Sequence, residues 1–169
     1  MMKLVKVEKF FPNKQMITVG IGDYKIASNP KILATYALGS CVAIILYDRF
    51  KRIGALIHAM LPEPKISRPD NPMKYVRTSI PIVLSELIKK GAPKHRLISA
   101  LIGGANVLKY ASSMNIGDRN VKAAREVLRE KGIPIVAEDV GGTVSRSVFF
   151  DLEAATIFVT SPRRKVLFG

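Results

Sequence analysis

The sequence predicts an α+β protein, with mixed β-sheets in layers and helices flanking them. Two apolar runs of strand length, 41–47 and 53–61, follow each other across a charged turn. Two longer segments, 73–90 and 118–131, repeat apolar residues at helical spacing. Further strand-like runs stand before, between and after these segments. The order of strands, helix, strand, helix and strands is no strict βαβ repeat, so it favours a mixed α/β arrangement.

A single domain accounts for the length of the chain. With 169 residues, of which 48% are hydrophobic and 24% charged, the chain has a globular composition and can bury a core. We expect residues 1–16 to form an N-terminal extension or an edge strand, and residues 17–160 to form one domain that carries the chemistry. Residues 161–169, which include the basic run 163–165, are expected to form a tail.

Short strands are expected before the central apolar runs. The segment 16–21 is a β-type run that is interrupted by Gly20, and 24–27 is a second short run. The segment 32–38 is apolar and stops at a Gly-Ser pair, residues 39–40. Glycine and serine together mark a tight turn at this point.

The central apolar runs predict a β-hairpin. Residues 41–47 and 53–61 are each continuous and apolar, and the polar loop 48–52 joins them. A sheet with one wet face alternates apolar and polar residues, whereas these runs do not alternate. Both faces of the hairpin are therefore expected to be covered.

The first helix is expected within 73–90, after a loop at 62–72 that contains four prolines. Pro81 falls inside the helical pattern, so the helix either starts near Ser79 or is kinked. Gly91 is the natural C-terminal cap.

A buried strand and the second helix follow. Residues 97–102 read as a strand that ends at two glycines, and 118–131 reads as a helix with Asp118 as its N-cap and Gly132 at its end. Three more strand-like runs complete the chain, at 133–137, 147–152 and 155–160.

The charge balance indicates an acidic partner. The chain has 27 Lys and Arg against 13 Asp and Glu, a net charge of +14. The basic residues are spread in singles and pairs, and there are five Tyr, seven Phe and no Trp. Nucleic-acid binders more often carry a dense basic block or interleaved aromatic residues, so we expect no nucleic-acid partner.

The composition also indicates a cytoplasmic protein. One cysteine cannot form an internal disulfide, which fits a reducing compartment. The N-terminal residues lack the apolar core of a signal peptide, and no apolar run approaches the roughly 20 residues that span a bilayer. We expect no membrane insertion.

Cys41 is the candidate nucleophile, although a lone cysteine is more often buried and inert. It follows Gly39 and Ser40, whose turn can expose the thiol at a strand end. Such a turn also presents backbone N–H groups, the usual donors of an oxyanion hole. One of the two histidines, His58, lies across the predicted hairpin.

His58 is the candidate base. With the hairpin turn at 48–52, Cys41 and His58 are expected to lie roughly opposite each other, at Cβ distances of about 4.5–5.5 Å. An imidazole at this distance shifts a thiol towards thiolate. His58 stands in an apolar run, where a core histidine bonded to a carbonyl is the simpler interpretation. The other histidine, His95, lies in a basic loop and is expected on the surface.

A third group usually orients the base. Thr35 is one candidate, and the carboxylates of Asp48 and Glu63 are near in sequence. The residues alone do not choose among the three.

Other signals point away from metals and cofactors. One Cys and two His cannot build a typical structural zinc site, so we expect no metal. The glycine pairs at 103–104 and 141–142 lack the Lys and Ser/Thr of a phosphate-binding loop and indicate turns. The carboxylates Glu138 and Asp139 are more simply part of a turn or a cap.

Taken together, the motifs resemble the chemoreceptor glutamine deamidases, the CheD family of chemotaxis proteins. The segments that carry the resemblance are Ala34–Ala43, with Leu-Gly-Ser-Cys at 38–41, and Gly54–Pro62, with His-Ala-Met-Leu-Pro at 58–62. Later segments match as well, at 103–105, 116–120, 137–142 and 146–148. The resemblance extends from about residue 17 to residue 159.

The resemblance implies a fold similar to the catalytic domain of cytotoxic necrotizing factor toxins. It also implies that Cys41 is the nucleophile, His58 the base and Thr35 the residue that orients His58. The implied enzyme is a protein-glutamine glutaminase. It hydrolyses glutamine side chains through a thioester, without a cofactor. The implied substrates are methyl-accepting chemoreceptors, and the implied second partner is a CheC-type phosphatase.

Two other functions stay open. The chain could be a cysteine amidase or methylesterase of another specificity, with the same three residues. It could also be a non-enzymatic regulator of a CheC-type phosphatase.

Overall fold

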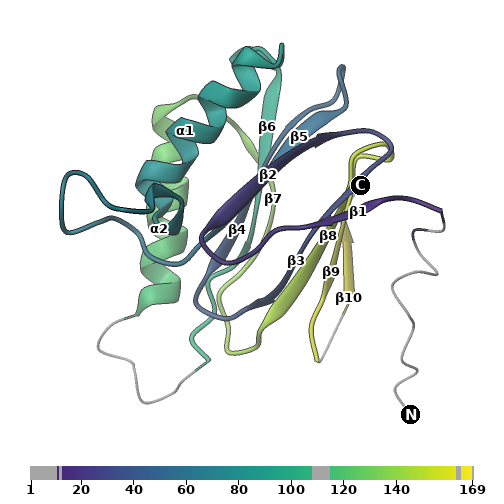
Figure 1. Ribbon diagram of the computed structural model, residues 1–169. Coiled ribbons are helices and arrows are strands. Elements are labelled where there is room, and N and C mark those ends of the chain that lie inside the picture. The colour runs from purple at the N-terminus through teal and green to yellow at the C-terminus, as the bar shows by residue number, and fades with distance from the viewer. Residues whose placement is uncertain (1–10, 12, 108–114, 163–164, 169) are drawn as a thin grey trace.

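Two five-stranded β-sheets pack face to face, and two helices cover the outer face of one of them (Figure 1). The computed structural model describes residue 11 and residues 13–107, 115–162 and 165–168. Both sheets contain parallel and antiparallel pairs. The predicted α+β class with layered mixed sheets is confirmed.

The first sheet has the order β1-β3-β8-β9-β10. β1 runs parallel to β3, and the other neighbours are antiparallel. Its strands are β1 (Met16–Thr18), β3 (Ile32–Leu38), β8 (Arg146–Asp151), β9 (Thr156–Thr160) and β10 (Lys165–Phe168).

The second sheet has the order β2-β5-β4-β6-β7. β7 runs parallel to β6, and the other neighbours are antiparallel. Its strands are β2 (Asp23–Ser28), β4 (Val42–Asp48), β5 (Ile53–Ala59), β6 (Leu97–Gly103) and β7 (Ile135–Val140). The predicted strands match these, with ends that differ by a few residues.

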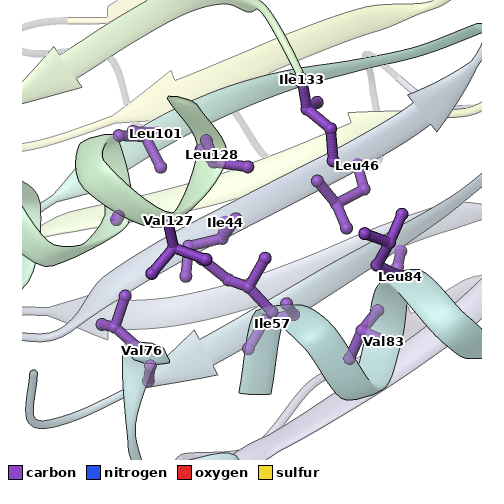
Figure 2. Close-up of a cluster of buried hydrophobic side chains, with 14 of the residues drawn as sticks. Ile44, Leu46, Ile57, Val76, Val83, Leu84, Leu101, Val127, Leu128 and Ile133 are labelled. Atoms are coloured by element: carbon purple, nitrogen blue, oxygen red, sulfur yellow. The ribbon is translucent and has the colours of Figure 1, made fainter. Parts of the chain in front are cut away.

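The predicted hairpin is β4 and β5, and all seven residues of β4 are buried. Side chains alternate across a strand, so each face of β4 carries its own apolar row. One row packs under the helices (Figure 2) and comprises Val42, Ile44 and Leu46; the other packs against the first sheet and comprises Ala43, Ile45 and Tyr47. The expected coverage of both faces is therefore confirmed.

Helix α1 (Val76–Lys89) follows a 3₁₀ turn at Pro72–Lys74 and includes Pro81 within it. The alternative start near Ser79 is wrong, since the helix begins at Val76. Gly91 caps the helix as predicted, with a φ of 90°. The N–H of Gly91 donates to Ile88 and that of Ala92 donates to Leu87, which is the hydrogen-bond pattern of a Schellman cap.

Helix α2 (Ile116–Glu130) begins two residues earlier than predicted. The N-cap is Asn115, in a left-handed conformation, so the assignment of Asp118 as the cap is wrong. Asp118 instead lies in the first turn, where its charge complements the helix dipole. The helix begins earlier because Gly117 packs against the turn after β6, a contact that a sequence pattern does not reveal. Gly132 closes the helix as predicted.

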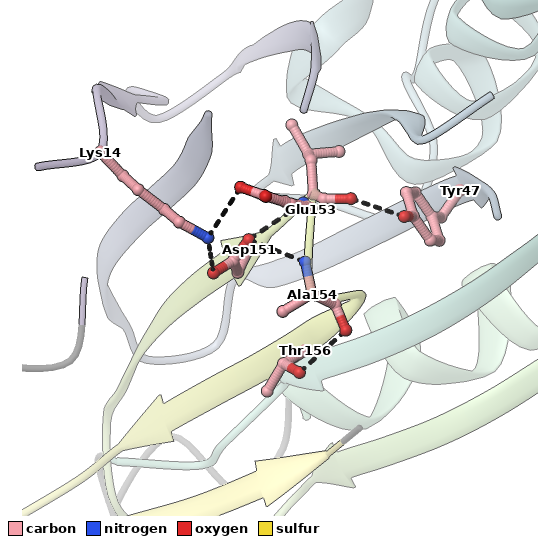
Figure 3. A network of polar contacts seen from close by, with 7 residues as sticks. Lys14, Tyr47, Asp151, Glu153, Ala154 and Thr156 are labelled. Carbon is pink, nitrogen blue, oxygen red and sulfur yellow. Dashed lines mark hydrogen bonds and ion pairs between the residues drawn. The ribbon is translucent and has the colours of Figure 1, made fainter. Parts of the chain in front are cut away.

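Described segments near both ends of the chain, at Lys14 and at residues 165–168, pack on the first sheet. The Lys14 ammonium pairs with Asp151 at 2.7 Å and with Glu153 at 3.3 Å (Figure 3), which ties residues before β1 to the end of β8. Part of the expected tail, residues 165–168, forms the edge strand β10. Residues 1–10 and 12 of the expected extension and residues 163–164 and 169 of the expected tail lie outside the described residues.

The hairpin turn is closed by a buried carboxylate. Asp48 accepts the backbone N–H groups of Phe50 and Lys51, and the Arg96 guanidinium donates to it at 2.7 Å and 3.0 Å. Burial alone raises the pKa of Asp48, but the hydrogen bonds from Arg96 and the turn lower it overall. Arg96 belongs to the 3₁₀ turn Lys94–Arg96.

We predict that Asp48→Asn lowers the free energy of unfolding by about 1–3 kcal/mol, because Arg96 loses a buried charged partner while the turn keeps its acceptor. Glu86→Gln, which removes an exposed ion pair with Lys89, is the control and should change it by less than about 0.5 kcal/mol. Chemical denaturation measures both. Equal effects of the two substitutions would contradict the assigned role of Asp48.

Candidate active site

The candidate nucleophile lies where the chain crosses from one sheet to the other. β3 belongs to the first sheet and β4 to the second, and residues 39–41 join them. Cys41 is half-buried, and its side chain packs against the core between the sheets. The predicted turn at Gly39 and Ser40 is therefore a crossover between two layers, and the thiol lies at its end.

Three hydrogen bonds hold the backbone of this crossover. The carbonyl of Gly39 accepts the N–H of Ala105, and that of Cys41 accepts the N–H of Gly104, each at 2.8 Å. The carbonyl of Ser40 accepts the side-chain amide of Asn120 at 2.9 Å. Three successive peptide carbonyls therefore point at fixed donors.

A β-bulge keeps Leu38 on the same inner face of the first sheet as Thr35. Pairing with β8 shifts register between Thr35 and Leu38, and Ala37 adopts a left-handed φ of 56°. Strand alternation alone would turn Leu38 to the face opposite Thr35. The extra residue restores the inward direction, so Thr35 and Leu38 are both fully buried.

Thr35 and His58 meet between the sheets. Thr35 lies on β3 and His58 on β5, and Oγ1 of Thr35 is 2.7 Å from Nδ1 of His58. The same hydroxyl donates to the carbonyl of Val19 at 2.8 Å. A hydroxyl has one proton, and a carbonyl only accepts, so Thr35 must accept from His58. Nδ1 therefore carries the proton of the neutral ring, and Nε2 keeps its lone pair.

Nε2 of His58 has no hydrogen-bond partner among the described residues, and the His58 side chain is almost completely buried. Desolvation lowers the pKa of His58, because burial disfavours the imidazolium. The ring is therefore a neutral base with a free acceptor nitrogen. The alternative of a core histidine bonded to a carbonyl is not observed, because the one bond of the ring goes to a threonine hydroxyl.

Cys41 and His58 lie on the same face of the hairpin but are not direct partners. His58 pairs with Ala43, two residues after Cys41, so the expected pairing was wrong by two positions. A shift of two keeps both side chains on one face. Diagonal neighbours of this kind lie about 7–8 Å apart, which long and aromatic side chains can bridge.

Burial of Cys41 favours the neutral thiol over the thiolate. Burial raises its pKa, and the backbone N–H of the same residue lowers it by a smaller amount. Burial also lowers the pKa of His58, so it favours the neutral form of both groups. The arrangement suits proton transfer from thiol to imidazole during a reaction, not a preformed ion pair.

The alternative orienting residues lie elsewhere. Asp48 is at the opposite end of β4, paired with Arg96, and Glu63 pairs with Arg77 on the surface. His95 is exposed, as expected. Glu138 pairs with Arg125. Among residues 11, 13–107, 115–162 and 165–168, no group of three His, Cys, Asp or Glu could hold a metal ion.

Two contributors were missed at the sequence level. The Val19 carbonyl fixes the Thr35 hydroxyl, and no pattern in side chains could reveal a backbone acceptor. Asn120 was detectable, because it interrupts an otherwise apolar or small-residue face of α2; the buried residues of that face are Gly117, Val121, Ala123, Ala124, Val127 and Leu128.

A cavity of about 260 Å³ lies between the sheets at the end of β4 that is distant from Cys41. Its lining includes Tyr47, Arg49 and Ile157. Neither Cys41, His58 nor Thr35 lines it, so it is separate from the candidate site. None of the helices within the described residues has the length and apolar character to cross a membrane.

Comparisons with known proteins agree with the motifs. A family model described as CheD chemotactic sensory transduction matches residues 60–161. A Pyrococcus abyssi protein named "Probable chemoreceptor glutamine deamidase CheD" is 44% identical over 156 residues, which are 90% of this chain and 93% of that protein. A protein with the same name from Caldanaerobacter subterraneus is 45% identical over 149 residues, which are 86% of this chain and 92% of that protein.

The fold also has a counterpart among solved structures. A Neisseria meningitidis protein of the DUF152 family aligns with a TM-score of 0.53 and 11% sequence identity, over 82% of this chain and 68% of that chain. At this identity the likeness concerns the fold alone. It supports the layered α+β arrangement.

The lowered pKa of His58 predicts a pH-dependent stability. Unfolding frees His58 to bind a proton below its usual pKa of about 6.5, so the folded state loses stability as the pH falls through this value. We expect the melting temperature of the wild type to fall between pH 7.5 and pH 5.5, and to fall less in His58→Gln. His95→Gln is the control and should behave as the wild type. An equal fall in His58→Gln would contradict the buried neutral ring.

Proposed function

The chain belongs to the CheD family, and we propose that it hydrolyses the side-chain amide of glutamine residues in chemoreceptors, with Cys41 as the nucleophile. The observation that carries the proposal is the state of His58. Its Nδ1–H is held by Thr35, and its Nε2 is an acceptor without a partner among the described residues. A base oriented in this way, diagonally across the hairpin from the sole thiol of the chain, is what thiol chemistry needs.

The first step is attack on the amide carbon. His58 Nε2 takes the proton of Cys41, and the sulfur forms a bond to the amide carbon of the substrate. The positive charge on His58 is stabilised through Nδ1–H, which donates to Thr35, and Thr35 in turn donates to Val19. These two hydrogen bonds orient the ring and spread the new charge without a carboxylate.

Backbone N–H groups of the crossover supply the oxyanion hole. In a planar trans peptide the N–H points away from the C=O. The Gly39 carbonyl is directed at Ala105 and the Ser40 carbonyl at Asn120. The N–H groups of Ser40 and Cys41 therefore point the other way, available to a developing oxyanion beside the thiol.

Collapse of the tetrahedral intermediate breaks the C–N bond. The imidazolium of His58 gives its proton to the departing ammonia, which leaves a thioester on Cys41. His58 then takes a proton from water, and the resulting hydroxide attacks the thioester. Cys41 leaves as the thiolate and recovers its proton from His58. The sum is amide plus water to carboxylic acid plus ammonia, and no cofactor takes part.

The substrate class rests on the relatives and on charge. The curated relatives described above carry the name of chemoreceptor glutamine deamidases. A net charge of +14 favours an acidic protein partner by long-range attraction. We place the reaction in the cytoplasm. The interaction with a CheC-type phosphatase stays a prediction.

We predict that incubation with a purified chemoreceptor converts specific glutamines to glutamates, and that Cys41→Ala abolishes the conversion because no nucleophile remains. Peptide mass spectrometry of the receptor measures it. His58→Gln should reduce the rate by about 10²–10⁴-fold, the usual contribution of a general base. His95→Gln is the control and should retain the wild-type rate.

Conversion that persists in Cys41→Ala would refute the thiol mechanism. If no receptor glutamine changes but a CheC-type phosphatase co-purifies with the wild-type protein, the protein is instead a regulator of that phosphatase. If other amides or methyl esters are cleaved, it is a cysteine hydrolase of another specificity.

A second prediction isolates Thr35. Thr35→Val keeps the shape but removes the hydroxyl, so Nδ1–H of His58 loses its acceptor. We expect kcat to fall about 10- to 1,000-fold, part of the 10²–10⁴-fold that a positioned base contributes. Thr35→Ser should restore most of the loss, and Thr18→Val, at an exposed position of β1, should have no effect. An unimpaired Thr35→Val would show that Thr35 does not orient the base.

A further inference from the structure

Asn120 is a buried amide on a helix face that is otherwise apolar or small. It is 0% exposed and stands next to Val121, one turn before Ala124. An amide without hydrogen bonds is unfavourable at such a position. The hydrogen bonds of Asn120 explain why an amide occupies this position.

The side-chain nitrogen of Asn120 donates to two carbonyls, Ser40 and Met60, each at 2.9 Å. Ser40 precedes Cys41, and Met60 follows His58 by two residues. Both partners are carbonyls and only accept, so the NH₂ group must face them. One amide therefore connects the loop that carries the thiol with the strand that carries the base.

We propose that Asn120 is a positioning residue that holds Cys41 in place relative to His58. This rests on the function proposed above for those two residues. Asn120 is fully buried, so it does not touch a substrate and acts through the backbone. It fixes the Ser40–Cys41 peptide, whose N–H is that of Cys41 itself and lies beside the thiol.

Close backbone packing brings Asn120 within reach of both carbonyls. A Cβ at Gly117 would lie 2.5 Å from the carbonyl oxygen of Gly104 and 2.6 Å from that of Ala105, so only glycine allows the first turn of α2 to approach this closely. Gly104 and Ala105 also donate to the carbonyls of Cys41 and Gly39. The turn after β6 and the start of α2 thus hold the crossover as one unit.

The acceptor end of Asn120 indicates that stability alone does not explain this residue. Its Oδ1 is buried and has no hydrogen-bond partner among the described residues. A buried acceptor without a partner is unfavourable. The amide therefore donates to the crossover and to the end of β5, while its own acceptor is not used. This is expected if the donors serve to position the backbone.

The experiment compares three variants of the full chain: Asn120→Asp, Asn120→Ala and Val127→Ala. Aspartate keeps the volume, removes the donors and directs a negative charge at the two carbonyls, and alanine removes the group without adding a charge. Val127 is a buried residue of the same helix that packs in the core between α2 and the second sheet, so its substitution is the control for loss of stability. Melting temperature, receptor deamidation and the rate of Cys41 alkylation by iodoacetamide are measured, with rates taken well below each melting temperature.

We expect both Asn120 variants to lower kcat about 10- to 100-fold, the cost of a displacement of about 1 Å, with KM changed less than about threefold. The rate of Cys41 alkylation should change in the same variants. Val127→Ala should lower the melting temperature while kcat and the alkylation rate stay within about twofold of the wild type.

The proposal is overturned if Asn120→Asp folds and keeps wild-type kcat and alkylation rates, or if Val127→Ala loses kcat to the same degree at a similar melting temperature. Should Asn120→Asp fail to fold because of its buried charge, Asn120→Ala decides by the same two criteria. Absence of deamidation by the wild type would refute the proposed function instead. The alkylation rates would still test the role of Asn120, because iodoacetamide needs no receptor.

Discussion

The hydrogen bond between Thr35 and His58 is the interaction on which the site depends. It joins the two sheets across their common core, from β3 in one to β5 in the other. The Val19 carbonyl takes the only proton of Thr35, so the direction of the bond is determined and the ring has a single neutral tautomer. Protein groups with no charge of their own thereby prepare a base, and burial keeps its lone pair free of protons.

The layered architecture explains why these residues come from different parts of the chain. A thiol on a crossover between sheets is close to both layers, yet a connection without regular structure has no ladder to hold it. The backbone donors of Gly104 and Ala105 and the amide of Asn120 take the place of that ladder. The β-bulge before the crossover has a related effect, because it keeps Thr35 and Leu38 directed at the same interior.

The sequence predicted the local elements well and the long-range geometry less well. Continuous apolar runs are sufficient to recognise β4 and β5, and helical spacing with a closing glycine is sufficient for α1 and α2. The partner of His58 could not be predicted in this way. Asp48 and Glu63 are close to the hairpin in sequence but lie elsewhere in the fold, whereas Thr35 lies on the other sheet. Sheet-to-sheet packing has no signature in periodicity, so the residues alone could not select Thr35, and the resemblance to a family suggested it.

The start of α2 was misplaced for a related reason, since contact with Gly104 and Ala105 overrides the preference for Asp118 as a cap.

The resting state of Cys41 has a consequence for chemical damage. Peroxides and other oxidants attack the thiolate far faster than the thiol, and burial raises the pKa of Cys41, which favours the thiol. The chain has no second cysteine that could resolve a sulfenic acid as an internal disulfide. Low intrinsic reactivity is then the main protection that the fold itself provides. In the proposed mechanism, a neutral pair of thiol and imidazole is activated more slowly than a preformed ion pair, and it resists oxidation better while no substrate is bound.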